Sequence, residues 1–314
     1  LIWGLVFGYL EGRRSTEFMA AMLSISLIFA SGFVKTVGRT LLHVLPINDF
    51  QMPFLTGAVF AIPLLLFVFF LELIPQPTAE DIELRTKRVP MNAEERKQFL
   101  QRFLPGVILT LVIYVLLTVM RDVRDNFEVE IWASLGVKGN LIYTSTDTKI
   151  SVIVLIAMSL LILVRKNLRA FSIIHLLIIF GCVLIGVSSI LFSLKMISPT
   201  TWMTMAGLGL YLGYVPYNAI FFERMIATFH YKSNVGFIIY VADSLGYLGS
   251  MTLLLVKELG RPNISWGDFF RQGVVFVAII GGIAAVLSLI YFLQSARKQN
   301  RNEQTEEELT IQPA

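Results

Sequence analysis

The stretch PGVILTLVIYVLLTVMRDVRDNFEVEIW (residues 105–132) joins a long apolar run to a dense group of charges. About 20 mostly apolar residues are needed to cross a bilayer as a helix, and the run 105–124 meets that requirement. The charged side chains at its end are Arg121, Asp122, Arg124, Asp125, Glu128 and Glu130. The stretch therefore predicts a membrane-spanning helix with one highly charged end.

Composition indicates that the rest of the chain is also embedded in a membrane. Hydrophobic residues make up 55% of the chain and charged residues 15%, with a mean hydropathy of +0.71, whereas soluble domains contain about 25% charged residues. The single cysteine, Cys182, excludes a disulfide framework within the chain. The net charge of +4 comes from basic residues between apolar runs, which is typical of topology signals. We predict a lipid bilayer as partner and no nucleic acid.

Nine candidate membrane spans follow one another along the chain. They are 1–10, 18–37, 53–74, 105–124, 148–164, 171–194, 202–222, 235–256 and 269–293. Because the first starts inside an apolar run without an initiator Met, we expect the chain to be a fragment of a longer protein. The polar insert before 105 contains a potential helix cap, Asn92, and predicts an amphipathic surface helix. The tail 297–314 is polar throughout and is predicted to be disordered.

The distribution of basic residues predicts which loops face the cytoplasm. Lys and Arg are more frequent in the alternate loops that share a side with the insert, so the insert and the C-terminus are predicted to be cytoplasmic. The four tryptophans fall at the opposite ends of their spans, where an aromatic belt is expected. They are Trp3, Trp132, Trp202 and Trp266.

Three spans, a long basic insert and six further spans resemble the later part of a major facilitator superfamily (MFS) transporter, a family of 6+6 spans. The resemblance implies an all-α polytopic membrane protein with an MFS-like helical bundle and an incomplete N-terminal lobe. It assigns 1–74 to helices 4 to 6 of that lobe, 75–104 to the cytoplasmic inter-lobe loop and 105–296 to the C-terminal six-helix lobe.

Local motifs support the same resemblance. GYLEGRR (8–14) resembles the Gly- and Arg-rich cytoplasmic turns of the superfamily. The combination of GYLEGRRSTE (8–17), NAIFFER (218–224) and YVADSLGYLGS (240–250) is similar to an uncharacterised bacterial family of facilitator-like membrane proteins. That similarity implies the bacterial cytoplasmic (inner) membrane as location.

Asp243 is the clearest charge inside a span. It lies about 12 Å from the start of its helix, near the middle of a hydrocarbon core of about 30 Å. Tyr240, Asp243, Tyr247 and Ser250 share one helix face. One interpretation is a stripe that lines a solute pathway, with Asp243 as solute ligand or proton carrier. The other is a structural pair between Asp243 and a group on a neighbouring helix.

Further polar residues lie on two other spans. Tyr211, Tyr214 and Asn218 share a face of the span 202–222, which predicts either a second part of the pathway or a tyrosine-filled packing surface among its glycines. Lys35 is a pathway candidate that alternatively extends to the interface. We interpret the lone His175 as a packed, hydrogen-bonded residue and predict no metal site.

The charged end of the opening stretch allows two interpretations. Tyr114, Arg121, Asp125 and Glu128 lie on one helix face, and both Arg121–Asp125 and Arg124–Glu128 have the i, i+4 spacing of an ion pair. The first interpretation is a helix end neutralised by these pairs. The second is an Arg121 that clamps an anion through its planar guanidinium. Helix 7 of the organophosphate:phosphate antiporters resembles this stretch in its Arg and following acid, and the resemblance implies Arg121 as anion ligand.

These features favour a secondary transporter over an enzyme. We expect an MFS-type carrier that moves a small solute, with an organic anion as one candidate, by alternating access. A proton or co-ion is a candidate partner, and no cofactor is expected. The HExxH, GxSxG and GxxxxGK[ST] motifs are absent from the sequence, which disfavours an intramembrane enzyme or an ATP-driven pump. The alternative is an MFS-fold sensor or scaffold that does not transport.

Overall fold

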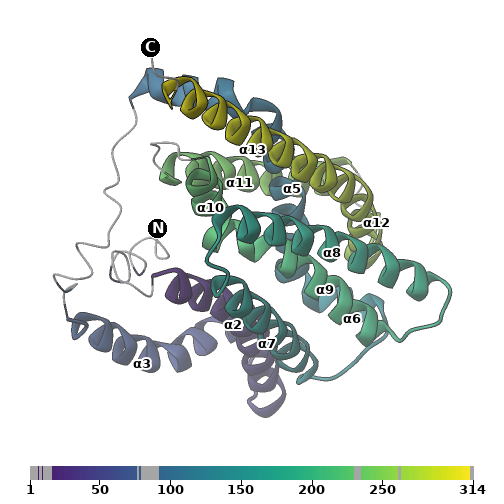
Figure 1. The fold of residues 1–314 in the computed structure, drawn as a ribbon. Helices are drawn as coiled ribbons and strands as arrows, with labels where there is room; N and C mark the ends of the chain where they lie inside the picture. Colours follow the sequence, from purple (N-terminus) through teal and green to yellow (C-terminus); the bar gives the residue numbers. More distant parts are fainter. Residues whose placement is uncertain are drawn as a thin grey trace.

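The computed structural model describes residues 6, 9, 16–75, 78, 92–229, 235–260 and 263–311, and within this part every regular element is helical (Figure 1). The α-helices are α2 (Thr16–Val44), α3 (Met52–Glu72), α5 (Ala93–Asn126), α6 (Glu128–Ser134), α7 (Ile142–Ile162), α8 (Asn167–Ser193), α9 (Pro199–Pro216), α10 (Phe222–Thr228), α11 (Val235–Gly260), α12 (Trp266–Phe276) and α13 (Gly282–Ile311). Two π-helical segments, η1 (Tyr217–Phe221) and η2 (Val277–Gly281), join α9 to α10 and α12 to α13. The all-α prediction is confirmed.

In the described part, seven helical stretches are long and apolar enough to cross a bilayer. They are Phe18–Val44, Met52–Glu72, Ala93–Asn126, Ile142–Leu161, Asn167–Ser193, Ile238–Gly260 and Trp266–Gln299, and each contains most of one predicted span. The predicted span 202–222 is helical too, but the π-helix η1 divides it into α9 and α10. The predicted span 1–10 lies outside the described residues except for residues 6 and 9.

Helix α5 is longer than predicted, because the expected surface helix and the expected span are one element of 34 residues. The helix begins after Asn92, as predicted. The Asn92 side chain accepts a hydrogen bond from the backbone N–H of Glu95 at 2.9 Å, and the Glu95 carboxylate accepts one from the backbone N–H of Asn92 at 2.8 Å. The helix passes through Pro105 without ending. Phe99 and Phe103 are buried, with Phe103 packed on Phe229, so the first turns belong to the bundle rather than to a separate surface helix.

This capping box gives a first prediction. Replacing Asn92 with Ala removes the cap of α5 and is expected to lower the free energy of unfolding by about 1 kcal/mol. Asn126→Ala, at the exposed far end of the same helix, is the matched control and is expected to change stability by less than about 0.5 kcal/mol. Thermal unfolding of the purified variants in detergent measures both, and equal effects would contradict a capping role.

The structure corrects two further expectations. Residues 297–311 continue α13 as helix instead of forming a disordered tail. They are rich in Glu, Gln, Lys and Arg, which are good helix formers, and they extend an existing helix without a new nucleation step. Trp132 and Trp202 are fully buried and donate to Glu128 and Ser189. They are therefore packed inside the bundle and do not form an exposed aromatic belt.

Close packing of small residues joins the central helices. Helix α8 lies along α9, and an added Cβ at Gly209 would come within 2.5 Å of the Gly181 carbonyl oxygen. The glycines of the span 202–222 thus serve a packing face, as one of the two interpretations held. Helix α2 lies along α7, whereas α3 stands apart from the bundle and packs on α2 (Figure 1). Among the described residues of α3 only Thr56 is buried, as suits a helix covered by lipid.

Candidate functional site

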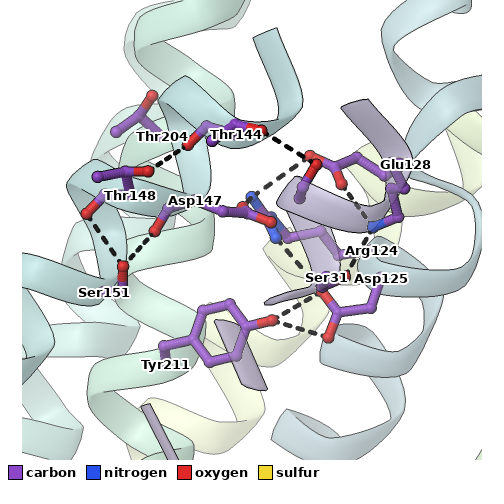
Figure 2. A network of polar contacts seen from close by, with 12 residues as sticks. Ser31, Arg124, Asp125, Glu128, Thr144, Asp147, Thr148, Ser151, Thr204 and Tyr211 are labelled. Carbon is purple, nitrogen blue, oxygen red and sulfur yellow. Dashed lines mark hydrogen bonds and ion pairs between the residues drawn. The ribbon is translucent and has the colours of Figure 1, made fainter. Parts of the chain in front are cut away.

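Arg124, on α5, is the centre of a buried ion-pair network (Figure 2). Its side chain has no exposed surface, and Nη2 lies 2.6 Å from Asp147 Oδ1 on α7 and 3.7 Å from Glu128 Oε1 on α6. Nη1 lies 3.3 Å from Asp125 Oδ1. Since neither Asp147 nor Glu128 is exposed, one guanidinium compensates acids on three helices.

Lys35 extends this network to α2. Its Nζ lies 2.6 Å from Glu128 Oε2 and donates to Ser31 Oγ at 2.8 Å. The side chain of Lys35 is only 18% exposed, so it pairs across helices instead of extending to the membrane interface. Together, the side chains of the ion-pair network are those of Lys35, Arg124, Asp125, Glu128 and Asp147.

Neutral side chains complete the hydrogen bonding of two of the acids. The Tyr211 hydroxyl lies 2.7 Å from both carboxylate oxygens of Asp125 and donates to them. The Trp132 indole N–H donates to Glu128 at 3.1 Å. Figure 2 shows Tyr211 directed from α9 toward Asp125. Buried polar groups are normally paired in this way, and the network thereby links α9 to α5.

The absence of a side chain at two glycines makes room for the network. A Cβ added to Gly207 would lie 2.8 Å from Arg124 Nε, and one added to Gly32 would lie 2.7 Å from Asp147 Oδ2 and 2.6 Å from the Tyr143 carbonyl oxygen. Separations below 3.0 Å are essentially never seen for real Cβ atoms. Glycine at these positions lets α9 approach Arg124 and lets α2 approach Asp147.

Hydrogen bonds between α2 and α7 fix the contact at Gly32. The Thr144 hydroxyl donates to Thr36 Oγ1 at 2.7 Å, and Thr36 donates to the Asn140 carbonyl oxygen at 2.9 Å. Thr144 Oγ1 also lies 3.3 Å from the Gly32 carbonyl oxygen. Helix α2, from the first part of the chain, is therefore held against α7 by polar contacts next to the network.

Arg121 belongs to a second polar group, which adjoins the ion-pair network on α5. Its Nη2 lies 2.6 Å from Asp122 Oδ1, and its guanidinium lies 4.1 Å from the centre of the Tyr214 ring. Ser250, on α11, donates to Asp122 Oδ2 at 2.5 Å. The predicted i, i+4 pair of Arg121 with Asp125 is wrong, because Asp125 is engaged by Arg124 and Tyr211. The predicted Arg124–Glu128 pair is confirmed at 3.7 Å.

Tyr114 joins this second group to Asp243. The Tyr114 hydroxyl donates to Asp243 Oδ1 and lies 3.2 Å from Asn218 Oδ1 in η1. The ring of Tyr114 stacks on Tyr214, with centroids 5.7 Å apart. Pro216 precedes the π-helix that carries Asn218, and such segments occur frequently at functional sites.

The stripe predicted on α11 is only partly assembled. Asp243 and Ser250 contact α5, but Tyr240 and Tyr247 are 75% and 64% exposed. Helix α11 contacts Tyr114 and Thr118 of α5 at Gly246. A helix turns by about 100° per residue, which places Tyr240 and Tyr247 at the edge of the stripe that is farther from Gly246. The shared face predicted for the four residues is therefore divided between a helix contact and an exposed surface.

Asp147 was not recognised as a site residue from the sequence. Its ion-pair partner Arg124 is 23 positions away, so no helical spacing connects the two. A signal was present in TSTDTKIS (144–151), where small polar residues open an otherwise apolar span. His175, by contrast, is buried and lies 2.9 Å from the Phe171 carbonyl oxygen and 3.1 Å from Ser288 Oγ, which confirms its interpretation as a hydrogen-bonded packing residue.

Long apolar helices packed around buried ion pairs define a multi-pass helical membrane protein. Residues 1–295 match a family described as a family of unknown function, DUF5690, and the chain belongs to that family. No curated protein and no solved structure matches the chain.

Proposed function

We propose that this protein is an MFS-type secondary transporter that moves a small organic anion by alternating access. The observation that carries the proposal is the buried ion-pair network, in which Lys35 from the first part of the chain pairs with Glu128 from the second at 2.6 Å. Ionisable groups inside a membrane are expensive, and they usually mark solute and ion pathways. Here they lie where α2 meets α6 and α7.

The arrangement of helices agrees with a two-lobe carrier. In the proposed fold, α2 and α3 belong to the N-terminal lobe and the helices from α5 onward to the C-terminal lobe, so the α2–α7 contact lies between lobes that rock against each other. Arg102 of α5 lies 3.5 Å from Gln299 of α13, at which the apolar stretch Trp266–Gln299 ends. The inter-lobe loop and the C-terminal end are therefore on one side, which we assign to the cytoplasm of a bacterial inner membrane.

Arg121 is the proposed ligand of the anion. Its side chain is 15% exposed, its guanidinium is stacked on Tyr214, and its Nε has no hydrogen-bond partner among the described residues. A planar guanidinium with a free N–H suits a carboxylate or phosphate group. Asp243 and Tyr114 lie on the same side of α5 and supply a carboxylate and a hydroxyl for other polar groups of the solute.

The proposal predicts a specific loss of affinity. A thermal-shift screen first identifies anions that stabilise the full-length protein, and the affinity of the Arg121→Gln variant for these anions is then measured. The substitution is expected to weaken binding about 10- to 100-fold, because a hydrogen bond to a charged group contributes about 1.5–3 kcal/mol. Arg271→Gln is the matched control, since Arg271 is 49% exposed and pairs only with Asp268 of its own helix among the described residues.

Transport itself is tested by counterflow of the bound anion in proteoliposomes. Uptake that depends on the protein and falls in Arg121→Gln supports the proposal. An anion that binds to Arg121 but shows no counterflow would instead indicate a sensor or scaffold with this fold. Equal affinities of Arg121→Gln and Arg271→Gln would remove Arg121 as the ligand.

A further inference from the structure

The ion-pair network contains one more acid than base. Lys35 and Arg124 face three carboxylates, those of Asp125, Glu128 and Asp147. The charged groups that act on Asp147 are Arg124 and Asp125 of α5 and Glu128 of the adjoining α6. Lys35 of α2 and Tyr211 of α9 contact two of these acids, Glu128 and Asp125. Arg39 and Glu130 lie near Tyr143, one turn before Asp147, and carry opposite charges. Full ionisation would therefore leave one unpaired negative charge.

Asp147 is the acid least able to carry that charge. Glu128 is paired with Lys35 and bonded to Trp132, and Asp125 receives the Tyr211 hydroxyl and is 23% exposed. Asp147 has no exposed surface, and its Oδ2 has no hydrogen-bond partner among the described residues. A buried carboxylate in this position is expensive to ionise and is instead neutralised by a proton.

The space at Asp147 favours a proton over a metal ion. Oδ2 lies directly against the backbone of α2, where a Cβ on Gly32 would come within 2.7 Å of it. A metal such as calcium needs about six oxygen ligands at 2.3–2.6 Å, and the described residues contain no group of three or more His, Cys, Asp or Glu side chains placed to hold a metal ion. A proton needs no additional room.

We propose that Asp147 is a proton-binding site and that its proton is the coupling ion of the transporter, an inference that rests on the proposed function. A proton from water binds the Asp147 carboxylate at Oδ2 and gives a neutral carboxylic acid that still accepts from Arg124 through Oδ1. Lys35 then balances Glu128, Arg124 balances Asp125, and α2 lies against a neutral group. Release of the proton leaves the network with one negative charge in excess at the α2–α7 contact, although Arg124 still contacts Asp147, and this favours separation of the two helices and entry of water.

Infrared spectroscopy of the full-length protein in lipid nanodiscs tests the site without a solute. Wild type at neutral pH is expected to show a protonated-carboxyl C=O band that shifts in D2O, and Asp147→Asn is expected to lose that component. Asp125→Asn and Asp243→Asn are the matched acid-to-amide controls and are expected to retain it. A component that persists in Asp147→Asn would overturn the proposal.

The pH dependence of thermal unfolding provides a second measurement. Because the folded protein retains a proton that the unfolded chain releases, wild type is expected to gain stability relative to Asp147→Asn as the pH falls. The amide has the shape and neutrality of the protonated acid, so the variant is expected to fold. Failure to fold, parallel pH profiles, or stabilisation of wild type by sodium at fixed pH in place of a proton would each contradict a proton site. None of these results depends on whether solute is transported, so the two proposals fail independently.

Discussion

Replacing Arg124 with Met is expected to destabilise the protein more than any other single charge removal. The change leaves Asp125, Glu128 and Asp147 with Lys35 as their one cation in the network. Breaking a buried ion pair by removing one partner costs about 3–5 kcal/mol, because the remaining charge stays buried without compensation. The expected result is a large fall in the unfolding temperature, or loss of folded protein from the membrane fraction.

Arg271→Met is the control for this effect, because it removes the same side chain from a site that is 49% exposed. Its effect is expected to stay below about 0.5 kcal/mol. Unfolding of both variants in the same detergent gives the comparison. A stability of Arg124→Met within about 1 kcal/mol of wild type would mean that the network does not hold the helices together.

Replacing Gly32 with Leu is expected to separate α2 from α7. The first added atom already falls 2.6 Å from the Tyr143 carbonyl oxygen and 2.7 Å from Asp147 Oδ2, and a backbone oxygen has little freedom to move. We expect a loss of about 3 kcal/mol, at the upper end of the cost of overpacking, together with loss of solute counterflow.

Gly57→Leu provides the matched control in the neighbouring helix. Gly57 is also a helical glycine, but an added Cβ meets no atom of the described residues within 4 Å. The substitution is expected to be neutral or slightly stabilising, because Leu favours helix more than Gly by about 0.8 kcal/mol. Equal losses in the two variants, measured by thermal unfolding and by counterflow, would contradict a specific role for the α2–α7 contact.

The sequence predicted the long helices well, because uninterrupted apolar runs depend on composition alone. The start of α5 was also predictable, since Asn92 and Glu95 form the local pattern of a capping box. The break in the span 202–222 was not, although Pro216 marks the place where the π-helix η1 begins. The helical continuation at 297–311 was missed because its polar sequence has no apolar period.

The candidate site was predictable only where its contacts are local. Spacing along one helix identified Arg124–Glu128, which is formed, and Arg121–Asp125, which is not. The shortest of the Arg124 contacts, to Asp147 at 2.6 Å, joins separate helices, and helical periodicity carries no information on that distance. Lys35 was predicted as a pathway candidate or as a side chain that extends to the interface. Its ion pair with Glu128 was not predicted, because that acid is 93 positions away.

The residues of the second polar group form the proposed solute site. Arg121, Tyr114 and Asp243 are joined through Tyr214 and Asn218 by contacts among α5, α9, η1 and α11. The ion-pair network adjoins this group on the same α5 helix and extends to α2 and α7. Helix α5 thus carries both the proposed anion ligand, Arg121, and Arg124, the ion-pair partner of the proposed proton site Asp147 on α7. A movement of α5 would connect the two sites.

The distance between α2 and α7 tests alternating access most directly. The contacts of Gly32 with Asp147 and of Thr36 with Thr144 show that the two helices run antiparallel, so spin labels at the exposed positions Leu27 and Ile153 lie at about the same level. In full-length protein in nanodiscs, with Cys182 replaced by Ala, we predict two populations of distance, with the longer one enriched at alkaline pH. One unchanged distance at every pH, and in the presence of any anion that binds, would contradict a transporter that opens at this contact.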